Sequence, residues 1–161
     1  MASTTKSIDV NVPVSTAYNQ WTQFESFPQF MEGIEEVRQL DDKRLHWKAT
    51  IGGKTEEWVA EITEQHPDHR VAWTSTSGDH NAGVVTFHQL DATTTRVTVQ
   101  LDYDPQGVIE NVGDMLGVVD RRVQGDLERF KTFIEGRGVA TGAWRGDIEN
   151  QSDRTGVPGS Y

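Results

Sequence analysis

The feature that most constrains the fold is a series of six segments after residue 33 in which apolar and polar side chains alternate. In the segment 45–51, for example, Leu45, Trp47, Ala49 and Ile51 share one face. Alternation with a period of two is typical of a β-strand with one covered face and one wet face. The covered face continues through Trp58, Ala60, Ile62, Val71, Trp73, Ser75, Val85, Phe87, Val97, Val99, Leu101 and Tyr103. These segments predict an antiparallel sheet with a defined register.

Turn-forming residues divide these segments at intervals of roughly 10 to 12 residues. They are Asp41-Asp42-Lys43, Gly52-Gly53, Pro67-Asp68 and the loop 77–83. Such residues favour hairpins, so consecutive strands are expected to pair. A further strand is predicted over residues 7–12, where Ile8, Val10 and Val12 alternate with polar side chains. The expected sheet therefore has seven strands.

Two short helices are predicted between the first two strands, over residues 14–24 and from Ser26 to Gly33, with Pro28 in the first turn of the second. Every third residue of this stretch is aromatic, at Tyr18, Trp21, Phe24, Phe27 and Phe30. On an α-helix a period of three drifts by about 60° at each step, so one helix cannot direct all these rings to one pocket. We interpret them as two anchored turns that close one end of the sheet, with Phe30 and Met31 as candidate gate residues.

One long helix is predicted over residues 107–135, ended by Gly136 and Gly138. Its apolar positions fall within about 120° of arc, so one side is expected to pack on the sheet. They are Val108, Ile109, Val112, Met115, Leu116, Val119, Val123, Leu127, Phe130, Phe133 and Ile134. A curved sheet and a straight helix do not match along their whole length, which predicts a cavity between them. We expect one domain over residues 1–136 and a flexible Gly-rich tail over 137–161, with Trp144 as a candidate for docking.

The composition restricts the partners. The 161 residues include 25 Asp and Glu against 15 Lys and Arg, and the net charge of −10 disfavours a nucleic-acid partner. No apolar run approaches the roughly 20 residues of a membrane span, and no signal sequence is apparent, so we expect a cytoplasmic protein without stable membrane insertion. The lack of cysteine excludes disulfides and thiolate sites.

Four strings carry a resemblance to a known family: VNVPVSTAYNQWTQFESFPQFM, AWTSTSGDHNAGVVTF, TRVTVQLDYDP and GDLERFKTFIE. Through them the chain, over about residues 5–136, resembles the START-like or SRPBCC superfamily, and within it the bacterial polyketide cyclase/dehydrase group that overlaps the coenzyme Q-binding START-like proteins. The resemblance implies an α+β helix-grip fold, also called Bet v 1-like, and a hydrophobic cavity. It selects no reaction, because the superfamily includes lipid carriers, aromatase/cyclases and co-chaperones.

Signals for metal or nucleophilic chemistry are weak. His66 and His69 lie in a turn with Pro67, not at the helical spacing of metal ligands, and we expect no metal and no cofactor. Ser75 is the one serine at an inward position, and without a visible base it is expected to bond to backbone. His46 and His88 fall on the outward phase of their strands and are expected to be solvated.

Asp126 is the candidate for acid or base chemistry, because it lies near the edge of the helix's apolar stripe. A buried carboxylate is costly unless it is paired, and Arg122, one turn earlier, is its expected partner. In the alternative interpretation, Asp126 contacts a polar group of a ligand or a tyrosine hydroxyl in the cavity.

The residues proposed to line a ligand cavity are Phe30, Met31, Trp47, Trp58, Trp73, Phe87, Tyr103, Met115, Val119 and Asp126, and none is assigned as catalytic. Apolar walls with few polar groups are typical of sites for hydrophobic ligands, and also of ordinary cores. Indole N–H and phenol O–H groups need partners when buried and would orient a carbonyl of the ligand.

Three functions remain open. The first is a non-catalytic protein that binds a quinone, a lipid or a polyketide-like compound, past a gate formed by the short helices and loop 77–83. The second is a cyclase or dehydrase that uses polar cavity residues for acid/base chemistry. The third is a protein-interaction module of the co-chaperone type, which requires an exposed apolar patch. A cavity of about 300 Å³ or more would favour the first two over the third.

Overall fold

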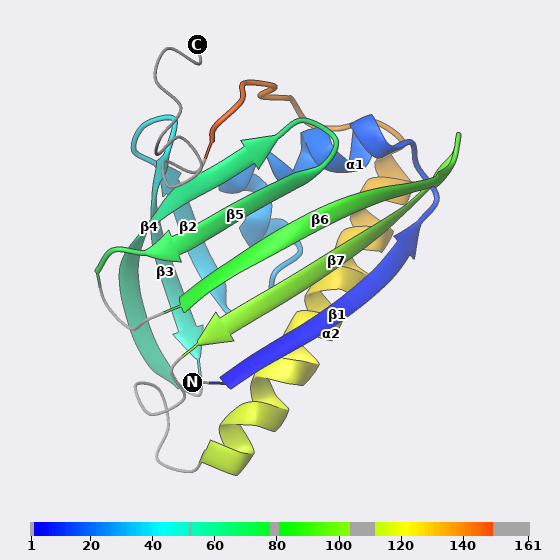
Figure 1. Cartoon of the computed structure of the whole chain (residues 1–161). Coiled ribbons are helices and arrows are strands. Elements are labelled where there is room, and N and C mark those ends of the chain that lie inside the picture. Colours follow the sequence, from blue (N-terminus) through cyan, green and yellow to red (C-terminus); the bar gives the residue numbers. More distant parts are fainter. Residues whose placement is uncertain (1, 52, 78–80, 104–111, 150–161) are drawn as a thin grey trace, which may run out of the picture.

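The structure is a computed structural model that describes residues 2–51, 53–77, 81–103 and 112–149, with side chains except at 2, 51 and 112–117. Figure 1 shows a curved antiparallel sheet with the helices on one of its faces. The strands are β1 Ala2–Val10, β2 Ile34–Gln39, β3 Arg44–Ile51, β4 Lys54–His66, β5 Arg70–Ser75, β6 Asn81–Asp91 and β7 Thr94–Tyr103. The helices are α1 Val14–Trp21, the 3-10 helix η1 Phe24–Gln29, and α2 Val112–Arg137.

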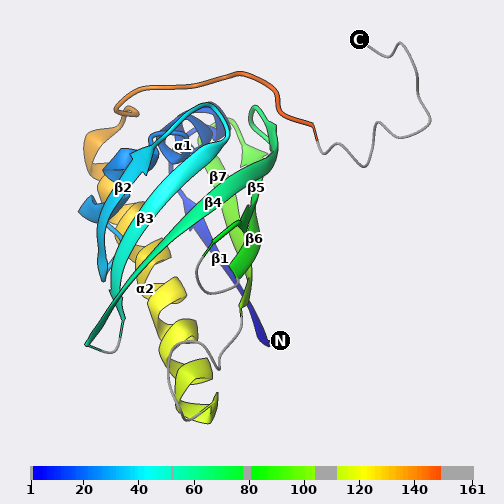
Figure 2. The same ribbon diagram turned by 90° about the vertical axis from the view of Figure 1, so that its left-hand side faces the viewer.

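The sheet has seven strands in the order β1-β7-β6-β5-β4-β3-β2. From β2 to β7 each strand pairs with the next one along the chain, as the turn chemistry predicts, and β1 pairs with β7. Figure 2 shows the sheet curving around α2, with α1 at one end. This arrangement confirms the predicted helix-grip fold.

Three local predictions need correction. β1 runs from Ala2 to Val10 rather than over 7–12, because its pairing with β7 continues as far as Tyr103. The second short helix is a 3-10 helix, η1, with Pro28 inside it. His46 is only partly exposed, and its Nε2 atom lies 3.2 Å from a carboxylate oxygen of Glu57. The expected start of the long helix at residue 107 lies outside the described residues.

The core gathers around the aromatic residues of α1 and η1. Trp21 contacts Phe130 of α2 with ring centroids 5.0 Å apart, and Phe30 contacts Phe130 at 5.3 Å. Tyr18 is fully buried, and its hydroxyl accepts a hydrogen bond from Gln65. The five rings of this stretch therefore anchor two turns to the sheet and to α2, as the drift of a three-residue period predicts.

Gly33 ends the η1 region in a backbone conformation that glycine adopts easily, with φ of +83°. A Cβ at this position would lie 1.9 Å from Nη1 of Arg122 and 2.8 Å from the carbonyl oxygen of Thr50. The chain therefore passes close to both β3 and α2 here, which brings Met31 and Glu32 against the helix.

Residues 139–149 contact the domain, although their sequence shows no apolar periodicity. Trp144 packs on the core, as expected, and Ile148 is buried and pairs with Gln65 of β4. The domain boundary after residue 136 stays a prediction. Among the described residues no helix combines the length and the apolar character that crossing a bilayer requires.

Candidate functional site

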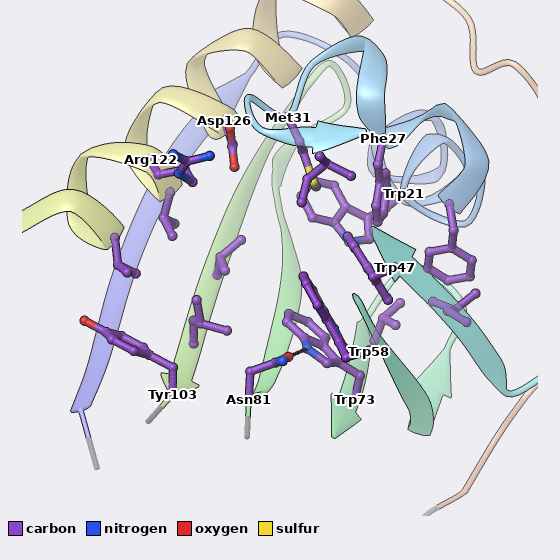
Figure 3. A pocket seen from close by; sticks show the side chains of 18 of the residues that line it. Trp21, Phe27, Met31, Trp47, Trp58, Trp73, Asn81, Tyr103, Arg122 and Asp126 are labelled. Atoms are coloured by element: carbon purple, nitrogen blue, oxygen red, sulfur yellow. Dashed lines mark hydrogen bonds between the residues drawn. The ribbon is translucent and has the colours of Figure 1, made fainter. Parts of the chain in front are cut away.

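A pocket of about 230 Å³ lies between the sheet and α2. Figure 3 shows side chains of the sheet, of the η1 region and of α2 pointing into it. The lining residues are Trp21, Phe24, Phe27, Met31, Ile34, Leu45, Trp47, Glu56, Glu57, Trp58, Ile62, Val71, Trp73, Asn81, Val99, Leu101, Tyr103, Val119, Arg122, Val123, Asp126 and Leu127. Most are apolar, and the polar ones include a largely buried carboxyl, that of Asp126, whose side chain is 18% exposed.

Most of the predicted cavity residues line this pocket. They are Met31, Trp47, Trp58, Trp73, Tyr103, Val119 and Asp126. Phe30 and Phe87 lie elsewhere, in the packed core, where Phe30 contacts Phe130 and Phe133 and Phe87 contacts Tyr18 and Trp21. Met115 lies in α2, but its side chain is outside the described residues. Whether any of these residues binds a ligand stays a prediction.

Stacked indole rings form the wall opposite α2. Trp47 and Trp58 are direct partners in the register of β3 and β4, and their rings stack 5.8 Å apart with an angle of 5° between their planes. Because both rings lie on the same face of adjacent strands, the stack is fixed by the sheet itself. The Trp47 Nε1 atom is buried and lacks a hydrogen-bond acceptor within the described part of the chain, which costs about 1–3 kcal/mol for a buried donor.

Trp73 extends this wall. Its ring lies over Gly83 of β6, where a Cβ would come within 2.6 Å of it, so a larger residue at 83 would displace the ring. Its Nε1 donates a hydrogen bond to the side-chain oxygen of Asn81, 3.3 Å away (Figure 3). The Ser75 hydroxyl accepts a hydrogen bond from the backbone N–H of Asn81, which confirms that this serine bonds to backbone.

The Asp126 carboxyl forms the polar edge of the pocket. Its Oδ1 atom accepts hydrogen bonds from Arg129, at 2.5 Å, and from the backbone N–H of Glu32, at 3.0 Å. The predicted partner, Arg122, instead donates to the carbonyl oxygen of Glu32 at 2.8 Å. The predicted ion pair is therefore wrong, because the residue one turn later along α2 also lies on Asp126's side of the helix.

Burial raises the pKa of the Asp126 carboxyl above its ordinary value, although Arg129 and the Glu32 N–H oppose this. Figure 3 shows an oxygen of this carboxyl directed toward the pocket. A carboxyl with a raised pKa in an apolar pocket is able to exchange a proton closer to neutral pH than an exposed one. Asp126 therefore combines the two properties that acid/base chemistry requires, position and a shifted pKa.

Tyr103 lies at the far end of the pocket from the aromatic residues of α1 and η1. It is buried and packs with Val119, Leu101 and Val123. Burial raises the pKa of its hydroxyl, and the charge of Asp120 adds to this effect. The phenol therefore stays protonated and keeps an O–H group.

The sequence did not indicate several lining residues. Trp21, Phe24 and Phe27 were interpreted as core anchors, and they are buried in the core while also bordering the pocket. Glu56 and Glu57 belong to the rim formed by β4, where Lys54 lies 3.1 Å from Glu56 and His46 lies 3.2 Å from Glu57. Alternation along β4 places Glu56 on the same face as Trp58, so it could have indicated Glu56, but it places Glu57 on the opposite face and gave no signal for it.

The described residues contain no cluster of His, Asp and Glu side chains arranged to hold a metal ion. His66 of β4 does contact two carboxylates, those of Glu64 and Asp147. They lie outside the lining of the pocket.

Comparisons with known proteins agree with this geometry. A family model described as polyketide cyclase / dehydrase and lipid transport matches residues 10–132. An uncharacterized 17.2 kDa protein of Streptomyces lincolnensis is 56% identical over 149 residues, which are 92% of this chain and 99% of that protein.

Solved structures show the same fold. A protein of Deinococcus radiodurans is 27% identical with a TM-score of 0.67, covering 86% of this chain and 100% of that one. The Zhui aromatase/cyclase of Streptomyces sp. R1128 has a TM-score of 0.73 at 17% identity, covering 89% and 99%. A START superfamily protein of Mycobacterium smegmatis has a TM-score of 0.67 at 17% identity, covering 84% and 95%. The family match bears out the resemblance to the polyketide cyclase/dehydrase group, and these structures confirm the START-like fold.

Proposed function

Since the chain belongs to the polyketide cyclase/dehydrase and lipid transport family, we propose that it binds a hydrophobic small molecule in the pocket between the sheet and α2. The observation that carries the proposal is that four indole rings, those of Trp21, Trp47, Trp58 and Trp73, border open space instead of filling it. Protein interiors normally leave few voids larger than a water molecule, so a wall of large aromatic side chains around a void is typical of a ligand site.

The pocket volume suggests a compact ligand. At about 230 Å³ the pocket is smaller than the roughly 300 Å³ that would by volume alone favour a small-molecule function over a protein-interaction module. An apolar cavity of about 150 Å³ holds benzene, so this pocket has room for a somewhat larger ring system. A quinone or polyketide-like ring fits this limit, and a long isoprenoid or acyl chain would extend beyond it.

We still propose that the ligand enters past the η1 region, but with fewer gate residues than the sequence suggested. Phe30 is 2% exposed and packs among rings of α2, so it belongs to the fixed part of the wall. Met31 is partly exposed and lines the pocket. We therefore assign the gate to Met31 alone. Residues 78–80 of the other proposed gate loop lie outside the described residues.

The test is binding of a fluorescence-quenching probe, 1,4-naphthoquinone, to the purified chain, with native mass spectrometry to detect ligand that copurifies. Leu101→Trp places a large side chain in the pocket and is expected to lower affinity at least tenfold. Leu90→Trp, at an exposed position of β6, is the matched control and should bind as the wild type does. Equal binding by both variants would contradict the proposal.

A second candidate function, a cyclase or dehydrase, is favoured by Asp126, because its buried carboxyl has a raised pKa and faces the pocket. Here Asp126 would move a proton on a bound polyketone. If Asp126→Asn abolishes turnover of a copurified compound while Asp120→Asn on the same helix does not, the protein is an enzyme. Unchanged ligand after incubation with the wild type supports a carrier.

The third reading, a protein-interaction module, has less support. It requires a contiguous apolar patch. Among the described residues, the large exposed hydrophobic side chains are Leu40, Leu90 and Val139. They lie at the end of β2, near the end of β6 and after α2, so they are spread over separate elements. A cytoplasmic location and the exclusion of nucleic acid stay predictions from composition and charge.

A further inference from the structure

Residues 139–149, here called the strap, cross the outside of α1 and reach the end of β4. Figure 2 shows them running over the end of the sheet where α1 lies. Gln20 of α1 exchanges two hydrogen bonds with Thr141, and the backbone N–H of Trp144 donates to the Thr22 hydroxyl at 3.0 Å. The strap is therefore fixed to α1 by side chains and backbone together.

The far end of the strap pairs with β4. Ile148 and Gln65 exchange two backbone hydrogen bonds, of 2.7 and 2.8 Å. Arg145 donates to Asn19 and to Asp68, and its guanidinium lies 5.6 Å from the centre of the Tyr18 ring. Ile148 thus extends the sheet by one bridge, and Arg145 ties the strap both to α1 and to the turn between β4 and β5.

His66 joins the strap to β4 through two carboxylates. Its Nδ1 atom lies 2.6 Å from Oδ1 of Asp147 in the strap, and its Nε2 atom lies 3.0 Å from Oε2 of Glu64 in β4. Ionised carboxylates only accept hydrogen bonds, and only the protonated imidazole has two N–H donors. A neutral His66 would leave one ring nitrogen lone pair facing a carboxylate oxygen. This geometry therefore suits the protonated form.

We propose that the strap is a proton-controlled latch: protonated His66 holds residues 139–149 against α1 and β4, and loss of this proton releases them. Within the described part of the chain, the charged groups beside the latch include Arg70, which donates to Glu64, the pair Arg145–Asp68, and Glu149 of the strap itself. His69 lies in the same turn and is exposed. Arg70 and Arg145 keep their charge at all relevant pH values, so among the side chains that bond to the latch His66 is the one whose charge changes near neutrality.

The sign of the pH dependence follows from the two hydrogen bonds. Asp147 raises the pKa of His66 above its ordinary value of 6.5, Glu64 adds to this, and burial opposes it. The docked strap therefore binds the proton more tightly than the released strap does. Docking is strongest below about pH 6.5 and weakens as the pH rises through the raised value.

Release would act on the pocket through α1. The residues that the strap contacts in and after this helix, Asn19, Gln20 and Thr22, flank Trp21, whose ring lines the pocket. This part of the inference rests on the proposed ligand-binding function. With the strap released, α1 loses these bonds, and the ligand is expected to dissociate faster.

Hydrogen exchange of the full chain without ligand tests the latch independently of binding. The protection factors of the Ile148 and Trp144 amides, corrected for intrinsic exchange, are measured from pH 6 to pH 8. For one linked proton they are expected to fall by up to about tenfold per pH unit between about pH 6.5 and the raised pKa, and to level off above it. His66→Gln should remove this slope. Asp147→Asn should also remove it, because an amide can donate to the neutral ring and keep the strap docked.

His88→Gln is the control, because His88 is an exposed residue of β6, and it should retain the wild-type slope. Flat protection in the wild type, or a slope that persists in both His66→Gln and Asp147→Asn, overturns the latch. Naphthoquinone dissociation is then followed at the same pH values. A pH-dependent strap with no naphthoquinone binding would contradict the proposed function but not the latch. Binding with a strap that does not respond to pH would contradict only the latch.

Discussion

The two ends of α2 face the same sheet but are packed differently. Toward its C-terminus, Leu127, Phe130 and Ile134 are at most 1% exposed and lie among the rings of α1 and η1. Toward its N-terminus, Val119 and Val123 face Leu101 and Tyr103 in a smaller cluster, and this part of the helix borders the pocket. Leu127 lies at the boundary, since it belongs to the main core and also lines the pocket.

This difference shows where the cavity comes from. The sheet offers apolar side chains along its whole inward face, so the sheet alone does not make one end hollow. The aromatic side chains of α1 and η1 fill the space at one end, and nothing equivalent among the described residues fills the other. The short helices between β1 and β2 therefore determine how much of the space between the sheet and α2 remains unfilled.

The largest expected effect is at the filled end. Phe130 is fully buried and contacts both Trp21 and Phe30. Phe130→Ala should lower the free energy of unfolding by about 3–5 kcal/mol, because it removes a large side chain from a close-packed site. Urea denaturation followed by circular dichroism measures this. A loss below about 1 kcal/mol would mean that this end is not close-packed, and the comparison between the two ends would fail.

A matched pair on β7 sharpens the comparison. Val97 is fully buried in the core, and Val99, two residues along the same face, lines the pocket. Val97→Phe should cost about 1–3 kcal/mol of unfolding free energy by overpacking, whereas Val99→Phe can extend into the pocket and should cost less than about 1 kcal/mol. Equal costs in urea denaturation would show that the open end has no usable space.

A smaller effect is expected where the η1 region meets the hollow end of α2. Arg122 donates to the Glu32 carbonyl oxygen at 2.8 Å. Arg122→Met should lower the free energy of unfolding by about 0.5–1.5 kcal/mol, the net contribution of one hydrogen bond. Arg121→Met, at an exposed position of the same helix, is the control in the same denaturation assay. If the two variants lose the same amount, the contact with Glu32 does not stabilise this end.

The subtlest expected effect is a difference in pH dependence between two carboxyls of α2. The pKa of Asp126 is raised by burial, so its protonated form favours the fold, and its contribution is lost as the pH rises above the ordinary value of 3.8. The pKa of Asp120 is lowered by Thr4 and Lys6, so its contribution is present at neutral pH and lost in acid. As the pH falls, the wild type should become more stable relative to Asp126→Asn. Over the same change it should become less stable relative to Asp120→Asn.

Denaturation of the wild type, Asp126→Asn and Asp120→Asn between about pH 2.5 and pH 7 measures both trends, because the Asp120 contribution changes only below the ordinary pKa of 3.8. Trends of the same sign at the two positions would contradict the assignment of Asp126 to a buried, desolvated edge of the pocket.

Much of the fold follows from the sequence because alternation and turn chemistry are local signals. The inward positions of β3, such as Trp47, were predicted from the period of two alone. The apolar side of α2 was predicted from the narrow arc into which its apolar residues fall. Alternation predicts on which face of the sheet a side chain lies, but not where it lies along the space between the sheet and α2. Phe87 and Trp73 both point inward, and only Trp73 lines the pocket, because the rings of α1 cover Phe87.

The polar contacts were harder to predict. On a helix, Asp126 can reach a partner one turn earlier or one turn later, and angular position did not separate Arg122 from Arg129. The contacts of residues 139–149 include hydrogen bonds to the side chains of Gln20, Thr22 and His66, which leave no periodic pattern in the sequence. Such contacts depend on the assembled fold, and sequence patterns carry little of that information.

The strand order also has a consequence for folding. β1 is the first of the described strands, yet among them it pairs only with the last, β7, in a register that joins Ala2 to Tyr103 and Val10 to Thr95. Neither can pair until the intervening hairpins bring the two ends of the chain together, and closing such a long loop is slow. During synthesis on the ribosome, β1 therefore emerges first and waits longest for its partner. The N-terminal strand is expected to be the last to join the sheet.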